Sequence, residues 1–119
     1  MAARWDKWVL EQGATFSKRF VIKENGTPKN LTGYTARMQI RRTKDSADAV
    51  VDMRTEAGFD GLISLGDLTG EVILNVPESF TKEIVVFGRC VYDFELVTGA
   101  VVTRLMEGVI TISQEVTRT

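Results

Sequence analysis

The C-terminal third of the chain is an almost unbroken run of strand-forming residues, and this run limits the possible folds most. Between residues 87 and 116 the sequence reads FGRCVYDFELV, then a break at Thr98-Gly99, then AVVTRLME, a second glycine at Gly108, and VITISQEV. Aromatic and β-branched residues favour strands, and glycines between such runs are typical of turns. The pattern therefore predicts a meander of three antiparallel strands.

The faces of this ribbon follow from its alternation of apolar and polar residues. Side chains two apart lie on the same face of a strand, which predicts an inward face made of Cys90, Tyr92, Phe94 and Leu96. Residues 101–106 differ because apolar side chains fall on both faces. Such a strand is either central in its sheet or covered by a partner subunit.

The rest of the chain repeats the two-residue period in shorter segments. Strands are expected at residues 5–10, 15–23, 34–42, 48–54, 62–65 and 71–76, with 48–54 at a sheet edge. The segment 77–83 starts with Pro77 and carries early acidic residues, which favours a short helix. Eight or nine short strands with one helix predict an all-β domain, built as two packed antiparallel sheets or a small barrel. With 119 residues the chain has the length of one domain, 1–119.

Composition removes most catalytic chemistries. The chain has no histidine and only one cysteine, so the usual Ser-His-Asp, Cys-His and zinc sites are absent, and no phosphate-binding glycine motif occurs. Asp93 and Glu95 share a face and resemble a glycosidase pair, but we interpret them as solvated charges that pair with Arg89 or Arg104. We therefore predict a protein that is not an enzyme and that has no catalytic, cofactor-binding or metal-binding residues.

Charge and N-terminal sequence bear on partners and compartment. Fifteen basic and sixteen acidic residues give a formal charge of −1, which argues against a dedicated nucleic-acid binder. The first residues, MAARWDKWVL, do not read as an export signal, and no segment is apolar enough to span a membrane. We expect folding in a reducing cytoplasm, with Cys90 buried as a small apolar side chain.

Six residues are candidates for contacts with other proteins. Tryptophan is enriched at binding hot spots, so Trp5 and Trp8 either both pack into the core or leave at least one ring for an interface. Other candidates are polar and lie on the 34–42 strand and in the charged loop after it. They are Arg37, Arg41, Lys44 and Asp48. The glycine-rich loop at 58–61 is a further contact region.

A family resemblance covers nearly the whole chain. The segments GATFSKRFVIKENGTPKNLTGYTARMQIR, GEVILNVP and RCVYDFELVTGAVVTRLMEGVITISQEVTR resemble small all-β structural modules of tailed bacteriophages. They are similar to the N-terminal domains of baseplate upper proteins and to tail-fibre attachment modules. These motifs are turn and strand patterns, so the resemblance carries over no site residues.

The resemblance implies an immunoglobulin-like β-sandwich and a structural role in the virion, assembled in the host cytoplasm. The chain would then be a tail, baseplate or fibre-attachment adaptor that contacts other virion proteins and copies of itself in a symmetric assembly. Two alternatives remain open at this point: a capsid decoration protein and a carbohydrate-binding β-sandwich module. Carbohydrate binding is not expected, because most of the aromatic residues alternate into the predicted core.

Overall fold

The fold is all-β. The structure, a computed structural model, describes residues 2–117 of the chain. Its strands are β1 (Ala3–Arg4), β2 (Trp8–Glu11), β3 (Phe16–Val21), β4 (Lys23–Glu24), β5 (Thr27–Pro28), β6 (Thr35–Arg41), β7 (Val51–Arg54), β8 (Gly61–Leu65), β9 (Glu71–Val76), β10 (Gly88–Thr98) and β11 (Val101–Ser113). One short helix, α1 (Glu78–Thr81), follows β9. The all-β prediction is confirmed.

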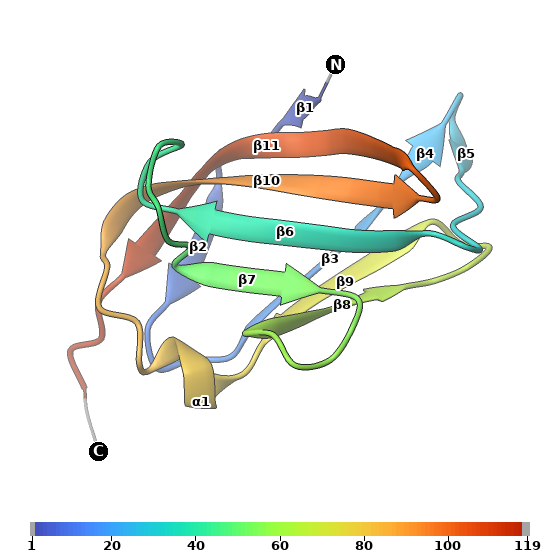
Figure 1. The fold of residues 1–119 in the computed structure, drawn as a ribbon. Helices are drawn as coiled ribbons and strands as arrows, with labels where there is room; N and C mark the ends of the chain where they lie inside the picture. Colours follow the sequence, from blue (N-terminus) through green and yellow to red (C-terminus); the bar gives the residue numbers. More distant parts are fainter. Residues whose placement is uncertain (1, 118–119) are drawn as a thin grey trace.

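Most strands belong to one curled sheet. The strand order is β1-β11-β10-β6-β7-β8-β9-β3, with β2 also paired to β11, while β4 and β5 form a separate small hairpin. Figure 1 shows β11, β10, β6 and β7 in front, with β8, β9 and β3 behind them. The curl occurs between β7 and β8, which are joined by only two residue pairs, Met53–Gly61 and Arg54–Leu62. The two layers on either side of this bend enclose the core.

The sheet is mixed, and the prediction of a purely antiparallel arrangement was wrong. Both N-terminal strands lie parallel to β11, with Ala3 opposite Met106 and Trp8 opposite Ile110. The short β7–β8 pairing is parallel too. The pairings of β1 and β2 with β11 join segments far apart in the chain, which local sequence patterns do not relate, whereas the short segment 55–60 connects β7 to β8.

The C-terminal ribbon is a two-stranded hairpin, and the prediction of three strands was also wrong. Thr98 pairs with Val101 around a tight turn at Gly99-Ala100, and the pairing continues to Gly88 opposite Ile112. Gly108 lies inside β11 and does not end it. The only irregularity is a bulge near Leu105, where the register shifts between Phe94 and Glu95. Such bulges increase the local twist of a strand.

β7 is an interior strand, which corrects the expected sheet edge at 48–54. It lies between β6 and β8, and the side chains of Val51 and Met53 are fully buried. The segment was expected at an edge because only two of its apolar residues, Val51 and Met53, alternate with charged ones. Those charges, Asp52 and Arg54, occupy the outer face and pair with each other at 3.0 Å.

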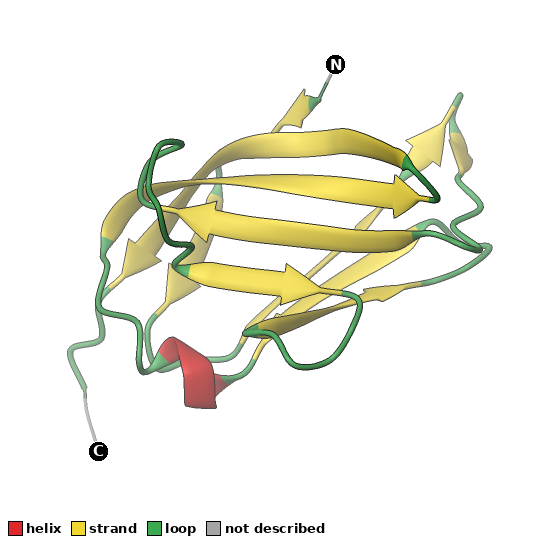
Figure 2. Cartoon of the chain, in the orientation of Figure 1, coloured by secondary structure: helices red, strands yellow, loops and turns green. Residues whose placement is uncertain are grey.

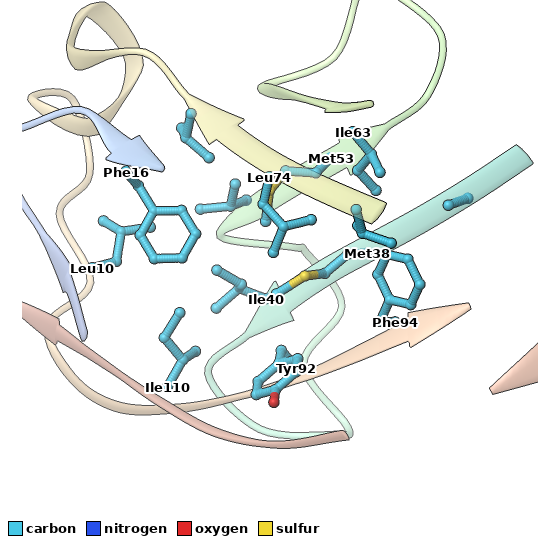
Figure 3. Close-up of a cluster of buried hydrophobic side chains, with 14 of the residues drawn as sticks. Leu10, Phe16, Met38, Ile40, Met53, Ile63, Leu74, Tyr92, Phe94 and Ile110 are labelled. Carbon is cyan, nitrogen blue, oxygen red and sulfur yellow. The ribbon is translucent and has the colours of Figure 1, made fainter. Parts of the chain in front are cut away.

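The core lies between the two layers of the curled sheet. Its buried apolar side chains come from every strand of four residues or more, and Figure 3 shows Ile40, Leu74, Phe94 and Ile110 pointing toward one another. The predicted inward face of the ribbon is confirmed, because Cys90, Tyr92, Phe94 and Leu96 are all buried.

Helix α1 covers one end of this core, as Figure 2 shows in red. Pro77 immediately precedes the helix in an extended conformation, and the helix lies within the predicted segment 77–83. Thr81 is fully buried, and its hydroxyl donates a hydrogen bond to the carbonyl oxygen of Ala14 at 2.8 Å. The helix thus fixes the turn between β2 and β3 to the connection after β9.

Candidate interaction surface

The N-terminal segment crosses β11 at Gly108. The amide of Trp5 donates to the carbonyl of Glu107 at 3.0 Å, and the Tyr92 hydroxyl donates to the carbonyl of Trp5 at 2.7 Å. A Cβ at Gly108 would clash with the Trp5 carbonyl oxygen, so only glycine fits this crossing. The apparent break in the sequence pattern is therefore a point of close backbone contact.

Asp6 fills the gap that this crossing leaves between β1 and β2. Its carboxylate accepts a hydrogen bond from the amide of Val109 at 2.8 Å and pairs with Arg4 at 2.9 Å. The hydrogen bond from Val109 is the main cause that lowers the pKa of Asp6 below its usual range. The carboxylate thus satisfies a backbone donor where regular strand pairing is interrupted.

The two tryptophans have different environments. Trp8 is partly buried and contacts three rings, Phe16, Phe20 and Tyr92, at centroid distances of 6.4, 6.0 and 5.2 Å. Trp5 is 44% exposed and has the ammonium of Lys7 over its ring. The reading in which both rings pack into the core is therefore wrong for Trp5. Its role at an interface stays a prediction.

The outer face of β6, β10 and β11 carries paired charges. Arg37 contacts Glu95 at 2.7 Å, and Arg104 contacts Asp93 at 3.5 Å and Glu107 at 3.4 Å. Asp93 thus pairs with Arg104, one of the two expected partners, whereas Glu95 pairs with Arg37 instead. Burial, followed by the charge of Glu95, raises the pKa of Asp93 above its usual value. Both carboxylates therefore take part in ion pairs on this face.

A shallow groove of about 420 Å³ lies on this outer face. Its lining includes Gln39 of β6, Val91 and Asp93 of β10, Arg104 of β11, and Lys44. The remaining lining residues are Arg4, Arg41, Arg89, Tyr92, Glu107 and Gly108. Lys44 belongs to the β6–β7 connection, which rises beside the ends of β10 and β11 in Figure 1. This loop therefore forms one side of the groove.

Arg41 holds that loop in place. Its guanidinium donates to the carbonyls of Ser46 at 2.9 Å and Ala47 at 3.2 Å, and to the side-chain oxygen of Gln39 at 2.7 Å. The loop is closed internally as well, since the amide of Thr43 donates to the Ser46 hydroxyl at 3.0 Å. Arg41 is thus a structural anchor that brings its own positive charge to the groove.

The second feature of this region is an open strand edge. Residues 106–107 of β11 pair with β1 and residues 110–113 pair with β2. In the described part of the chain, residues 101–104 pair only with β10, and Leu105 lies in the bulge. Val101 is 60% exposed and Val102 is 47% exposed. The predicted two-sided apolar strand therefore lies at an edge, where its backbone groups and valines are open to solvent.

The opposite end of the sheet is protected differently. Within residues 2–117, β3 pairs only with β9. Its middle carries Lys18 and Arg19, and Arg19 forms an ion pair with Glu71. Charged side chains on an edge strand discourage pairing with another chain. Of the two ends, the β11 edge is the one that is suited to strand addition.

The structure brings only some of the predicted contact residues together. Arg41 and Lys44 meet at the groove, whereas Arg37 lies farther along β6 and Asp48 is exposed in the loop without lining the groove. Sequence reasoning missed Arg4, Arg89 and Arg104, which complete the groove. Arg89 and Arg104 alternate with apolar residues as outward positions do, but their proximity to Arg4 depends on the parallel β1–β11 pairing.

The glycine-rich loop at 58–61 forms a separate surface beside β8. Phe59 is 42% exposed, and the guanidinium of Arg54 stacks over its ring at 4.6 Å. This contact holds one face of the ring against the domain and leaves the other to solvent. The expected contact role of this loop stays a prediction.

Comparisons with known proteins add no relative. No family model matches the chain, and no curated protein matches it. Within residues 2–117, no helix combines the length and apolar character required to cross a bilayer.

Proposed function

We propose that the chain is a non-enzymatic structural protein of a tailed bacteriophage particle, acting as an adaptor in the tail, baseplate or fibre attachment. The proposal rests on the motif resemblance and on a surface built for protein contacts. Its finer architecture would be an immunoglobulin-like sandwich, an assignment supported by the two facing layers of the curled sheet. The protein would act in the virion after assembly in the host cytoplasm.

The observation that carries the proposal is the open edge of β11 at residues 101–105. An edge strand offers unpaired amides and carbonyls to an incoming strand, and natural proteins usually block such edges with charges or proline. Here the first three residues are Val101, Val102 and Thr103, which have no charge. An added strand would bury both valines and satisfy the backbone groups.

The partner at this edge is a second copy of the chain. Two β11 edges that run antiparallel and are centred on Thr103 place Val102 opposite Arg104 of the other copy. This register avoids a direct contact between the two guanidinium groups, and the arginine stem covers the valine. Such an isologous contact is the simplest closed assembly, and copies of it build symmetric particles.

An electron-microscopic reconstruction of the native particle that contains this chain tests the proposal. We expect the domain in the tail or baseplate, with strand density from a neighbouring copy along residues 101–105. A location on the head would favour the capsid decoration role instead. A map in which the β11 edge faces only solvent, or a purified protein that turns over a substrate, would overturn the proposal.

A further inference from the structure

One end of the outer-face groove carries positive side chains that form no direct ion pair with a carboxylate within residues 2–117. At the other end Arg4 pairs with Asp6, and Arg104 pairs with Asp93 and Glu107. Arg41, in contrast, donates only to neutral oxygens. Lys44 and Arg89 line the groove and form no direct ion pair among the described residues, although the charge of Arg89 contributes to the lowered pKa of Asp6. Clustered like charges repel one another unless an anion lies between them.

We propose that this groove binds an acidic peptide segment, whose carboxylates pair with Lys44 and Arg89. Both side chains line the groove, where their N–H groups can donate hydrogen bonds to a carboxylate. Arg41 adds a third positive charge from a fixed position. This inference rests on the proposed function in one respect: the acidic segment would belong to a neighbouring virion protein.

The site is ordered before a ligand arrives. The loop that carries Lys44 is tied to β6 by the bonds from Arg41 to Ser46 and Ala47. At its start, Arg42 donates to the carbonyls of Phe87 and Arg89, which joins the loop to the beginning of β10. Binding to a fixed loop loses less conformational entropy than binding to a mobile one.

The charge pattern favours an acidic peptide over a nucleic acid. The groove is not uniformly basic, because Asp93 and Glu107 lie at its other end. A continuous phosphate backbone would meet these carboxylates along with the cations, whereas a peptide places its acidic side chains at intervals. Val91, which is partly exposed in the groove lining, suits a neutral residue between two acidic ones.

Fluorescence anisotropy with a short dye-labelled peptide of alternating Glu and Gly tests this proposal. The unchanged protein should bind it at low ionic strength, more weakly as salt is added, and should not bind a Gln-Gly peptide of equal length. The double variant Lys44→Gln, Arg89→Gln should lose about tenfold in affinity or more, because two charge-assisted hydrogen bonds are removed.

A matched control has the same change in net charge elsewhere. Lys23→Gln with Lys82→Gln alters two exposed lysines outside the groove and should change the affinity by less than about twofold, since distant exposed charges are screened. An equal loss in both double variants would overturn the proposal, and so would equal affinity for the Glu and Gln peptides. A single-stranded DNA probe that displaces the Glu peptide and binds more tightly would overturn it in favour of nucleic acid.

The same assay separates this proposal from the proposed function. Val102→Lys alters the β11 edge, outside the groove lining, and should leave binding of the Glu peptide within about twofold of the unchanged protein. Peptide binding that persists in a protein that does not self-associate would support the groove and count against the edge. A protein that self-associates but does not bind the Glu peptide would count against the groove and support the edge.

Discussion

Individual residues at the N-terminal crossing decide how the first segment attaches to the domain. Gly108 leaves room for the backbone of Trp5, Tyr92 provides a hydroxyl donor, and Asp6 caps the amide of Val109. Each role depends on a contact between residues about a hundred positions apart, as in the bond from Val109 to Asp6. A single substitution at this crossing should therefore affect the attachment of Trp5 before it affects the core.

Gly108→Ala should destabilise the protein by about 1–3 kcal/mol, because the added methyl group forces the Trp5 backbone away from β11. Urea unfolding measures the loss, and hydrogen exchange at the Trp5 amide should become faster. Thr111→Ala, at an exposed position of the same strand, should change stability by less than about 0.5 kcal/mol. Equal stability of Gly108→Ala and the unchanged protein would contradict the close crossing.

Tyr92 should make stability sensitive to alkaline pH. Burial is the main cause that raises its pKa from 10.0 to about 12, and the charge of Asp6 adds to the effect. In the unfolded chain Tyr92 ionises at a lower pH than in the folded protein. The stabilisation that results from its raised pKa is therefore complete below about pH 10 and is lost as pH rises toward about 12.

Tyr92→Phe provides the measurement. This variant should be about 1 kcal/mol less stable at neutral pH, because the hydrogen bond to Trp5 is lost. Its free energy of unfolding should fall less than that of the unchanged protein between pH 10 and about 12. Urea unfolding of both proteins across this range compares the two slopes. Parallel declines would show that Tyr92 is not the responsible group.

At the scale of elements, alternation predicted the faces of strands well and their neighbours less well. The buried positions of β6 and β10 follow directly from the two-residue period. Three features depend on distant pairing and could not be read locally: the interior position of β7, the parallel N-terminal strands and the continuity of β11 through Gly108. A glycine required by a neighbouring backbone looks, in sequence, like a glycine in a turn.

The β6–β7 loop provides an element-scale prediction. Arg41→Lys keeps the charge but removes the planar group that reaches two loop carbonyls and Gln39 at once, so the loop should open more often. Hydrogen exchange of amides 43–50 should become about tenfold faster or more, as expected for a loss of about 1.5 kcal/mol. Arg37→Lys, which changes the pair with Glu95, should leave these amides unaffected. Equal exchange in both variants would contradict the anchoring role of Arg41.

At the scale of the whole molecule, the fold has two different sheet ends and one mixed-charge face. The domain is elongated, with extents of 44 × 28 × 26 Å. Sequence reasoning identified Arg41 and Lys44 as outward residues, because outward polar positions are visible in the pattern, but it left the exposure of Trp5 undecided. It could not find the groove, since Arg4 joins Arg89 and Arg104 only through the parallel pairing of β1 with β11. The sequence showed that residues 101–106 are apolar on both faces, but it did not show that part of this segment lies at a sheet edge.

Sedimentation equilibrium over a range of protein concentrations tests the central claim, that the β11 edge pairs with a second copy. The unchanged protein should show a mass that rises from one chain toward two. Val102→Lys should shift this association to concentrations at least about tenfold higher, because a charge then lies on the pairing edge. Ser17→Lys, which adds the same charge at the β3 edge, should associate like the unchanged protein. A one-chain mass for the unchanged protein at every concentration, or identical association of Val102→Lys, would contradict the claim.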